Sequence, residues 1–234
     1  MIQRGEPTTP GTTLEPPPPQ PRRVREGRGN VCGSVAEFRT RRILVVAPQP
    51  FYEDRGTPIA VRQVLEALSE LGRPVDLLTF PIGSDVAIRG LRIFRSANPF
   101  GFRRVPIGLS VRKVILDLPL TCALYRRVSR ERYQCIHAVE EAAFPAAVLA
   151  RRHGISLLYD MQSSLAEQLA RLDPFGLPLT RRALNALEDW LLRRTSLVVT
   201  SAGLAARVNG RVPEDRKSTR LNPVTIISRM PSSA

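Results

Sequence analysis

The chain has 234 residues, 43% of them hydrophobic, which is enough for one packed domain with tails. Its formal net charge is +14, and almost all of the positive charge is arginine, because Lys113 and Lys217 are the only lysines. An arginine-rich surface is expected from a GC-rich genome, although this charge also favours phosphate-bearing partners, including anionic lipid head groups. The pattern holds no helix-turn-helix, zinc finger or aromatic platform, so nucleic-acid binding is not expected.

The three cysteines, Cys32, Cys122 and Cys135, are odd in number and show no paired spacing. They fit neither a disulfide framework nor a zinc site, which favours a reducing, cytoplasmic environment. The first residues are polar and proline-rich, unlike a secretory signal peptide. No apolar run approaches the roughly 20 residues of a membrane span. We therefore predict a cytoplasmic protein without a bound metal.

Three segments differ in composition. Residues 1–41 are rich in proline and arginine with few large apolar residues, and they are predicted to be disordered. Residues 42–213 alternate short apolar runs with amphipathic stretches and are predicted to form one domain. Residues 214–234 show no amphipathic period and resemble adaptor-derived sequence at the end of a truncated reading frame. We expect a non-native or disordered tail there, and a natural chain that was interrupted near residue 213.

The predicted elements alternate along the domain. Apolar runs predict strands at residues 43–47, 75–80, 91–94, 135–139, 156–161 and 197–200. Helical periodicity predicts helices at residues 57–71, 109–130, 142–153, 180–194 and 201–208. Thr57 is the expected N-cap of the first helix, and Pro119 is expected to kink or split the second. This alternation predicts an α/β, Rossmann-like three-layer sandwich with a mostly parallel sheet.

The loop after the first predicted strand contains the first candidate site. In open parallel sheets, ligands bind outside the carboxyl ends of the strands. Gly56 would let a ligand approach the backbone, and the free amides that begin the next helix, near Thr57, suit a phosphate or carboxylate. The alternative is that the turn itself requires a glycine. The G-x-G-x-x-G spacing of dinucleotide sites is absent, so NAD is not expected, and no other cofactor is predicted.

Two further polar segments follow strands at the same predicted edge. His137 lies in a buried strand that ends at Glu140 and Glu141. Acidic residues also suit a first helical turn, and a hydrogen-bonded core histidine is an equally good interpretation. The next strand ends in polar residues that include Asp160, Gln162 and Ser163. The alternative is that they cap the following helix, with Ser163 or Ser164 as N-cap and Glu167 closing a capping box. Together the three loops predict a cleft at one edge of the sheet.

The order of these features resembles the amino-terminal domain of the GT-B fold retaining glycosyltransferases of family 4. The resemblance covers residues 42–208. It rests on the first strand with its glycine loop, on the histidine-ended strand at 136–137 and on the polar end of the following strand. The acidic and tryptophan residues at 188–190 and the serine after the strand at 198–200 complete it.

This resemblance implies transfer of a sugar from a nucleotide-sugar donor to a glycan or lipid-linked acceptor, with retention at the anomeric carbon. Gly56 and Thr57 would face the donor diphosphate, and His137 and Glu140 would be the catalytic residues on the acceptor side. The remaining candidates would bind substrate: Glu141, Asp160, Gln162 and Ser163. The donor-binding carboxylates belong to a second domain that this sequence lacks, so the chain alone is expected to be inactive.

Two positions depart from the family pattern. Val139 stands where many relatives have a second histidine, and Gln162 stands where a histidine often ends the next strand. These changes weaken any role of imidazole in activating the acceptor. Retaining transfer depends instead on the donor phosphate and on electrostatic support for its departure. The alternative function is a non-catalytic, anion- or nucleotide-binding α/β module.

Basic residues flank the helix predicted at residues 109–130. They are Arg103, Arg104, Arg112 and Lys113 on one side and Arg126, Arg127, Arg130 and Arg132 on the other. A basic amphipathic helix of this kind can lie on an anionic membrane, where lipid-linked acceptors would be found. The alternative is a core-packed helix with solvated arginines at its ends. Peripheral membrane contact is therefore a second expectation.

Overall fold

The computed structural model describes residues 41–105, 110–164, 178–208, 210–212 and 216–220, with seven strands in one sheet of order β3-β2-β1-β4-β5-β6-β7. All paired strands in this part of the chain are parallel. The strands are β1 (Arg42–Ala47), β2 (Val75–Thr79), β3 (Leu91–Arg95), β4 (Tyr133–Val139), β5 (Ser156–Met161), β6 (Leu197–Ser201) and β7 (Lys217–Arg220). The helices are α2 (Gly56–Glu70), α3 (Val111–Arg130), the 3₁₀ turn η1 (Glu140–Ala142), α4 (Ala143–His153), α6 (Pro178–Leu192) and α7 (Ala202–Val208).

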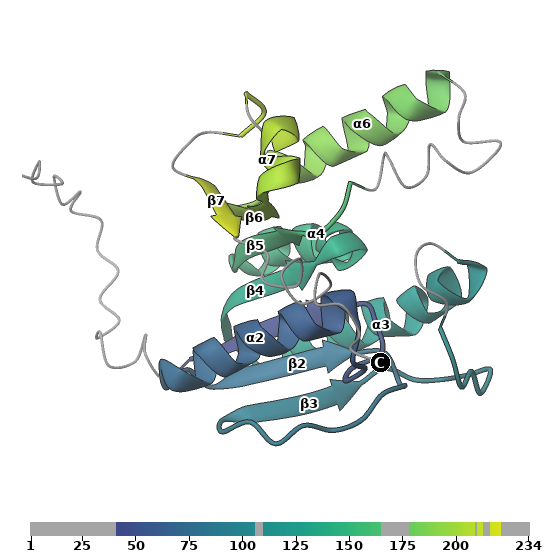
Figure 1. Cartoon of the computed structure of the whole chain (residues 1–234), viewed down its shortest axis with the longest axis vertical. Helices are drawn as coiled ribbons and strands as arrows, with labels where there is room; N and C mark the ends of the chain where they lie inside the picture. Colours follow the sequence, from purple (N-terminus) through teal and green to yellow (C-terminus); the bar gives the residue numbers. More distant parts are fainter. Residues whose placement is uncertain (1–40, 106–109, 165–177, 209, 213–215, 221–234) are drawn as a thin grey trace, which may run out of the picture. The chain divides into compact units, whose positions relative to one another are not determined.

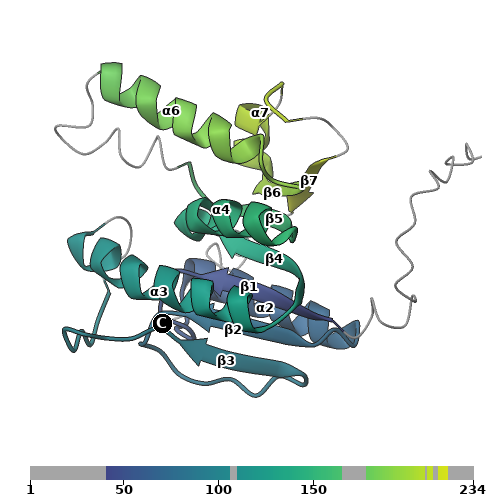
Figure 2. The same ribbon diagram turned by 180° about the vertical axis from the view of Figure 1, so that it is seen from behind.

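Helices cover both faces of the sheet. Figure 1 shows α2 in front of β1 and β2, and the reverse view in Figure 2 brings α3 and α4 to the front. Because side chains alternate along a strand, Val45 of β1 packs with Val61 of α2, whereas Leu44 joins Leu116 of α3 in the second core. The predicted Rossmann-like three-layer sandwich is confirmed.

The two ends of the chain were predicted to be tails. Residues 1–40 and most of residues 214–234 lie outside the described residues. Inside the second segment, however, Lys217–Arg220 pairs with β6 as the edge strand β7, where the sequence indicated no strand. Whether this segment is native stays a prediction.

Two helix predictions differ from the structure. Helix α2 begins at Gly56 after Arg55, so Thr57 is not its N-cap. Helix α3 is continuous through Pro119, because buried Leu116 and Leu120 pack against the core on either side of the proline. Its N-cap is Ser110, whose hydroxyl accepts a hydrogen bond from the backbone amide three residues later. No helix among the described residues is long and apolar enough to cross a bilayer.

The loop between β1 and α2 is held against the loop after β2. The amide of Phe51 donates to the carbonyl of Ile82 at 3.1 Å, and Arg95 of β3 donates to the carbonyls of Phe51 and Ile82 at 2.8 and 3.1 Å. Gly83 has φ of +116°, and a Cβ there would lie 2.4 Å from the Phe51 carbonyl carbon. Only a glycine at position 83 allows the two backbones to lie this close together. The contact sets the position of the loop that leads to Gly56.

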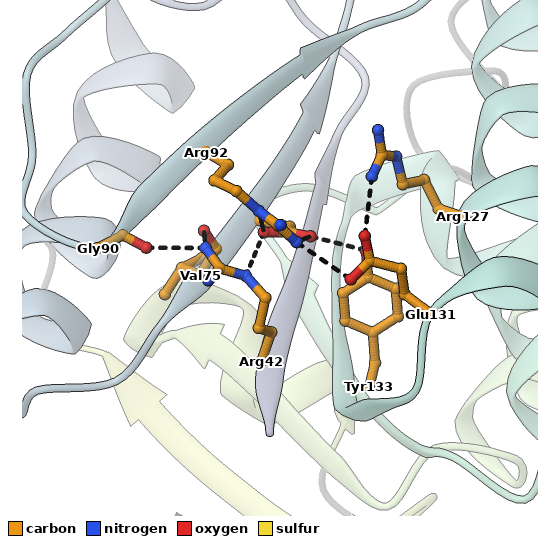
Figure 3. Close-up of polar contacts among 8 residues, drawn as sticks. Arg42, Val75, Gly90, Arg92, Arg127, Glu131 and Tyr133 are labelled. Atoms are coloured by element: carbon orange, nitrogen blue, oxygen red, sulfur yellow. Dashed lines mark hydrogen bonds and ion pairs between the residues drawn. The ribbon is translucent and has the colours of Figure 1, made fainter. Parts of the chain in front are cut away.

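At the opposite edge of the sheet, the fully buried carboxylate of Asp76 in β2 joins four strands. Figure 3 shows its partners Arg42, Arg92 and Tyr133. Its oxygens accept hydrogen bonds from three neighbouring strands: Arg42 of β1 at 2.5 Å, Arg92 of β3 at 2.7 Å and Tyr133 of β4 at 2.8 Å. Burial by itself would raise the pKa of Asp76, but these hydrogen bonds, led by that of Arg92, outweigh burial and lower it. The strands are therefore joined by a charge that stays ionised.

Replacing Asp76 with alanine should destabilise the domain by about 3–5 kcal/mol, because it leaves partly buried guanidinium groups without their counter-charge. Urea denaturation followed by circular dichroism measures this loss. The control is Asp85→Ala, which removes a 79% exposed carboxylate paired with Arg95 and should cost less than about 1 kcal/mol. Equal losses in the two variants would contradict a special role for the buried carboxylate.

Candidate functional site

The three predicted polar loops meet at one edge of the sheet. They follow β1, β4 and β5, which are consecutive in the strand order and parallel. The strand order reverses between β1 and β4, and the helices that follow these two strands lie on opposite faces (Figures 1 and 2). Ligands of open α/β sheets bind at such a switch point, so the predicted position of the site agrees with the topology.

His137 and Asp160 form a deeply buried polar pair in the site. The Nε2 atom of His137 lies 3.2 Å from Oδ2 of Asp160, and the two residues are 6% and 2% exposed. The side-chain amide of Gln162 donates to the other carboxylate oxygen, Oδ1, at 2.8 Å. The amide thus orients the carboxylate, and the carboxylate orients the imidazole ring. The structure joins three candidates that the sequence placed only on adjacent strands.

Glu140 stands where β4 ends, in a backbone conformation that glycine normally adopts. Its φ is +50°, the only positive φ among the described non-glycine residues. The hydroxyl of Ser163 donates to Glu140 Oε1 at 3.2 Å, which links the ends of β4 and β5. Non-glycine residues persist in the left-handed region only where their surroundings hold them, and such residues concentrate at functional sites.

The carboxylate of Glu141 lies against α3, where it pairs with a lysine. Its Oε1 lies 2.5 Å from Nζ of Lys113, which also lies 3.5 Å from Oε2 of Glu140. Burial would lower the pKa of Lys113, but the charges of Glu141 and Glu140 outweigh burial and raise it. Lys113 is therefore a buried, ion-paired residue, and its predicted place in a basic membrane-facing surface is wrong.

Asp117 lies one helical turn after Lys113 and carries an unsatisfied carboxylate oxygen. Its buried Oδ1 has no hydrogen-bond partner among the described residues. Asp117 and Glu141 line a cavity of about 90 Å³ whose other walls are mainly apolar. Burial, reinforced by the charge of Glu141, raises the pKa of Asp117 to about 7. No group of three or more His, Cys, Asp or Glu side chains in the described ranges is arranged to hold a metal.

Sequence reasoning gave Lys113 a surface role and missed Asp117, although the pattern contained a signal that both lie beside the buried row of α3. The buried row of α3 contains Leu116, Leu120 and Leu124. Lys113 lies three residues before Leu116, and Asp117 lies four residues after Lys113 and three before Leu120, so both border the buried row. A lysine and an aspartate on an otherwise apolar face indicate a buried ionic pair or cluster.

Gly56 and Thr57 begin α2, on the face of the sheet opposite α4 (Figures 1 and 2). Gly56 does not have a positive φ, and a Cβ built on it would meet nothing within 4 Å. The interpretation that the turn requires a glycine is therefore wrong. The fold leaves open space above this helix start, as a ligand that approaches the backbone would need.

Two acidic residues of α6 form hydrogen bonds with residues that follow β5 and α7. Ser164, at the end of β5, donates to the buried carboxylate of Glu188 at 3.0 Å. Arg211 donates to Glu188 at 3.0 Å and to Asp189 at 2.6 Å. The two acids that contribute to the predicted family pattern thus hold α6 against the end of β5 and the turn after α7.

The raised pKa of Asp117 predicts a pH dependence of stability. The folded protein holds the proton up to about pH 7, whereas the unfolded chain releases it near 3.8. The stabilisation that the protonated Asp117 provides is complete below its pKa in the unfolded chain, and it is lost as the pH rises through about 7. The Asp117→Asn variant carries no titrating group there. Relative to it, the free energy of unfolding of the wild type should fall by on the order of 2–4 kcal/mol as the pH rises from the unfolded to the folded pKa of Asp117.

Urea denaturation of both proteins at several pH values across this range measures the difference. The neighbouring charges are Glu141, Lys113 and Glu140, and both proteins keep all three. An Asp85→Asn control removes an exposed carboxylate and should leave the pH profile unchanged. Parallel profiles for wild type and Asp117→Asn would contradict a shifted carboxyl group.

Comparisons with known proteins agree with this architecture. The family model described as "glycosyl transferase 4-like domain" matches residues 55–222. Comparison with curated protein sequences found no match. A chain of sucrose-phosphate synthase from Thermosynechococcus elongatus aligns with a TM-score of 0.51 and 18% identity, over 77% of this chain and 87% of that one.

Two longer solved chains are similar over about half of their length. A second sucrose-phosphate synthase chain from the same organism is 20% identical with a TM-score of 0.51, over 77% of this chain and 47% of that one. The catalytic domain of starch synthase IV from Arabidopsis thaliana, bound to ADP and acarbose, is 12% identical with a TM-score of 0.53, over 78% and 51%. The predicted resemblance to GT-B amino-terminal domains is confirmed. Because the family model matches well over half of the sequence, the chain belongs to the glycosyl transferase 4-like domain family.

Proposed function

We propose that this chain is the acceptor-side domain of a retaining glycosyltransferase that moves a sugar from a nucleotide-sugar donor to a glycan or lipid-linked acceptor. The observation that carries the proposal is the pair of His137 and Asp160 at the switch point of the sheet, in a chain of this family. The alternative of a non-catalytic binding module shares the fold but gives no role to the strained, hydrogen-bonded Glu140.

The acceptor side of the proposed site is formed by His137 and Glu140. Asp160 holds the imidazole ring, and Ser163 holds one oxygen of the Glu140 carboxylate. A carboxylate and an imidazole at a strand end are suited to hydrogen bonds with sugar hydroxyl groups. Gln162 serves here as the support of Asp160, which gives a physical role to a position where relatives often have histidine.

The donor side is assigned to Gly56 and Thr57. The first amides of α2 have no partners within the helix and carry the positive end of its dipole, so they suit a diphosphate. The empty space above Gly56 supports this assignment. The rest of the donor site is assigned to a second domain, since this chain spans about half of the longer solved chains it resembles. The chain alone is accordingly expected to be inactive.

Gly56→Val tests the donor assignment, because the added side chain would fill the space meant for the phosphates. In a longer protein in which a donor-binding domain follows residue 213, the variant should lower transfer from a nucleotide sugar on the order of a hundredfold. Its melting temperature should change by less than about 2 °C, since a Cβ there meets nothing within 4 Å. Release of the nucleoside diphosphate measures the reaction.

The matched control is Gly203→Val, which alters another helical glycine with no atom within 4 Å of its Cβ, after β6. This variant should keep transfer within about threefold of the wild type. Full activity of Gly56→Val would remove the donor assignment. Nucleotide-sugar binding without any transfer in the longer protein would favour the non-catalytic module, and transfer by the 234-residue chain alone would contradict the need for a second domain.

We also infer that α3 contacts an anionic membrane surface. Its outer side has an exposed apolar row, Val111, Val114, Leu118 and Tyr125, whose members are 51–76% exposed. Exposed arginines lie before and along this helix: Arg103, Arg104, Arg112 and Arg126. An apolar row beside such charges fits the boundary between head groups and acyl chains. Action in the cytoplasm stays a prediction.

A Val114→Glu, Leu118→Glu double variant should weaken binding to vesicles containing phosphatidylglycerol about tenfold, because two carboxylates then face the lipid. Cosedimentation with the vesicles measures the change. The control is Leu71→Glu, Val148→Glu, which makes the same charge change at exposed apolar residues outside α3. Equal losses in the two double variants would show that net charge alone governs binding.

A further inference from the structure

A basic hollow lies at the edge of the sheet opposite the candidate site. Its volume is about 480 Å³, and it is bounded by the end of α3, the start of β4 and the turn between α4 and β5. The arginine and histidine side chains in its lining are Arg41, Arg130, Arg132 and His153. Small-molecule sites have volumes of roughly 300–1,000 Å³, so the hollow is large enough for a small ligand.

Two of the three arginines in the lining are not neutralised within the described residues. Arg130 and Arg132 are exposed and form no hydrogen bond or ion pair there. The one carboxylate in the lining, Glu131, lies 3.1 Å from Arg92 and 3.4 Å from Arg127, as Figure 3 shows. Its charge is therefore already shared by two guanidinium groups outside the hollow.

The wall behind these arginines is rigid. Tyr133 and Val128 line the hollow and are each 4% exposed. The hydroxyl of Tyr133 donates to the buried Asp76, which holds the start of β4 in place. Gly154 ends α4 with φ of +64°, the left-handed conformation of a helix cap. The backbone that carries Arg130 and Arg132 is therefore fixed, and only their side chains must be ordered when an anion binds.

Basic residues near the carboxyl end of a helix also offset the negative partial charge of that end. This partial charge is too small to neutralise the arginines of the hollow. The carboxyl ends of α3 and α4 each carry a partial charge of about −0.5, a total of about −1. Arg130 and Arg132 alone contribute two full positive charges, and α4 has Arg151 and Arg152 in its own last turn. A net positive charge therefore remains inside the hollow.

We propose that this hollow binds a compact phosphate-bearing anion through the guanidinium groups of Arg130 and Arg132. Guanidinium groups pair with phosphate through two parallel hydrogen bonds, and the polar lining disfavours an apolar ligand. The phosphate can belong to a free phosphorylated molecule or to a lipid head group. The site is separate from the donor phosphate position at Gly56 and does not depend on the proposed glycosyl transfer.

Calorimetric titration of the full chain with inorganic pyrophosphate at low salt tests the proposal. An Arg130→Gln, Arg132→Gln double variant should bind pyrophosphate at least about tenfold more weakly than the wild type. The control is Arg103→Gln, Arg104→Gln, which removes the same charge from exposed arginines outside the hollow and should change affinity less than about twofold. Circular dichroism verifies that each variant is folded.

Three outcomes would overturn the proposal: no binding by the wild type, equal weakening in both double variants, or loss of binding in Gly56→Val with none in Arg130→Gln, Arg132→Gln. The last outcome would place the anion at the proposed donor site, so the two proposals fail separately. Vesicles containing phosphatidylglycerol distinguish the sources. Reduced vesicle binding by Arg130→Gln, Arg132→Gln, with displacement by pyrophosphate, supports a lipid head group, whereas pyrophosphate binding without a vesicle effect supports a free phosphorylated ligand.

Discussion

The buried carboxylate of Asp76 is the point at which four adjacent strands are joined by charge. Arg42 and Arg92 reach it from the two strands beside β2, Tyr133 reaches it from the strand beyond β1, and all three donate hydrogen bonds to it. Because these partners come from β1, β3 and β4, the carboxylate aligns the starts of strands that are far apart in sequence. The alignment carries through to the other edge, where β1 and β4 end at the candidate site.

The two edges of the sheet differ in the sign of their charge. At the carboxyl edge, Glu140, Glu141 and Asp117 surround one ammonium group, that of Lys113. At the amino edge, arginines outnumber the carboxylates that neutralise them, and they line a hollow. Among the described residues, charge is therefore not spread evenly between the two edges. The proposed sugar hydroxyls and the donor diphosphate at Gly56 thus share the carboxyl edge, and the second proposed phosphate site lies at the basic amino edge.

Much of the site could be predicted from local pattern. His137, Glu140, Asp160 and Gln162 follow or end short apolar runs, and parallel strands bring such ends to one edge. Their partners could not be predicted in this way. The hydrogen bonds of Asp160 with His137 and Gln162 depend on which strands are neighbours and on their register, and neither is encoded in a local period.

The sequence by itself determined the alternation of strands and helices, and with it the three-layer α/β fold, because burial on one or both faces leaves a period in the residues. The tertiary structure alone decided the roles of charged and special residues. Lys113 has the sequence context of a basic surface helix, yet three-dimensional packing buries it between two glutamates. Gly56 resembles a turn glycine, yet its surroundings require no glycine. A charge or a glycine leaves no period of its own, so its environment is set by contacts between segments distant in the chain.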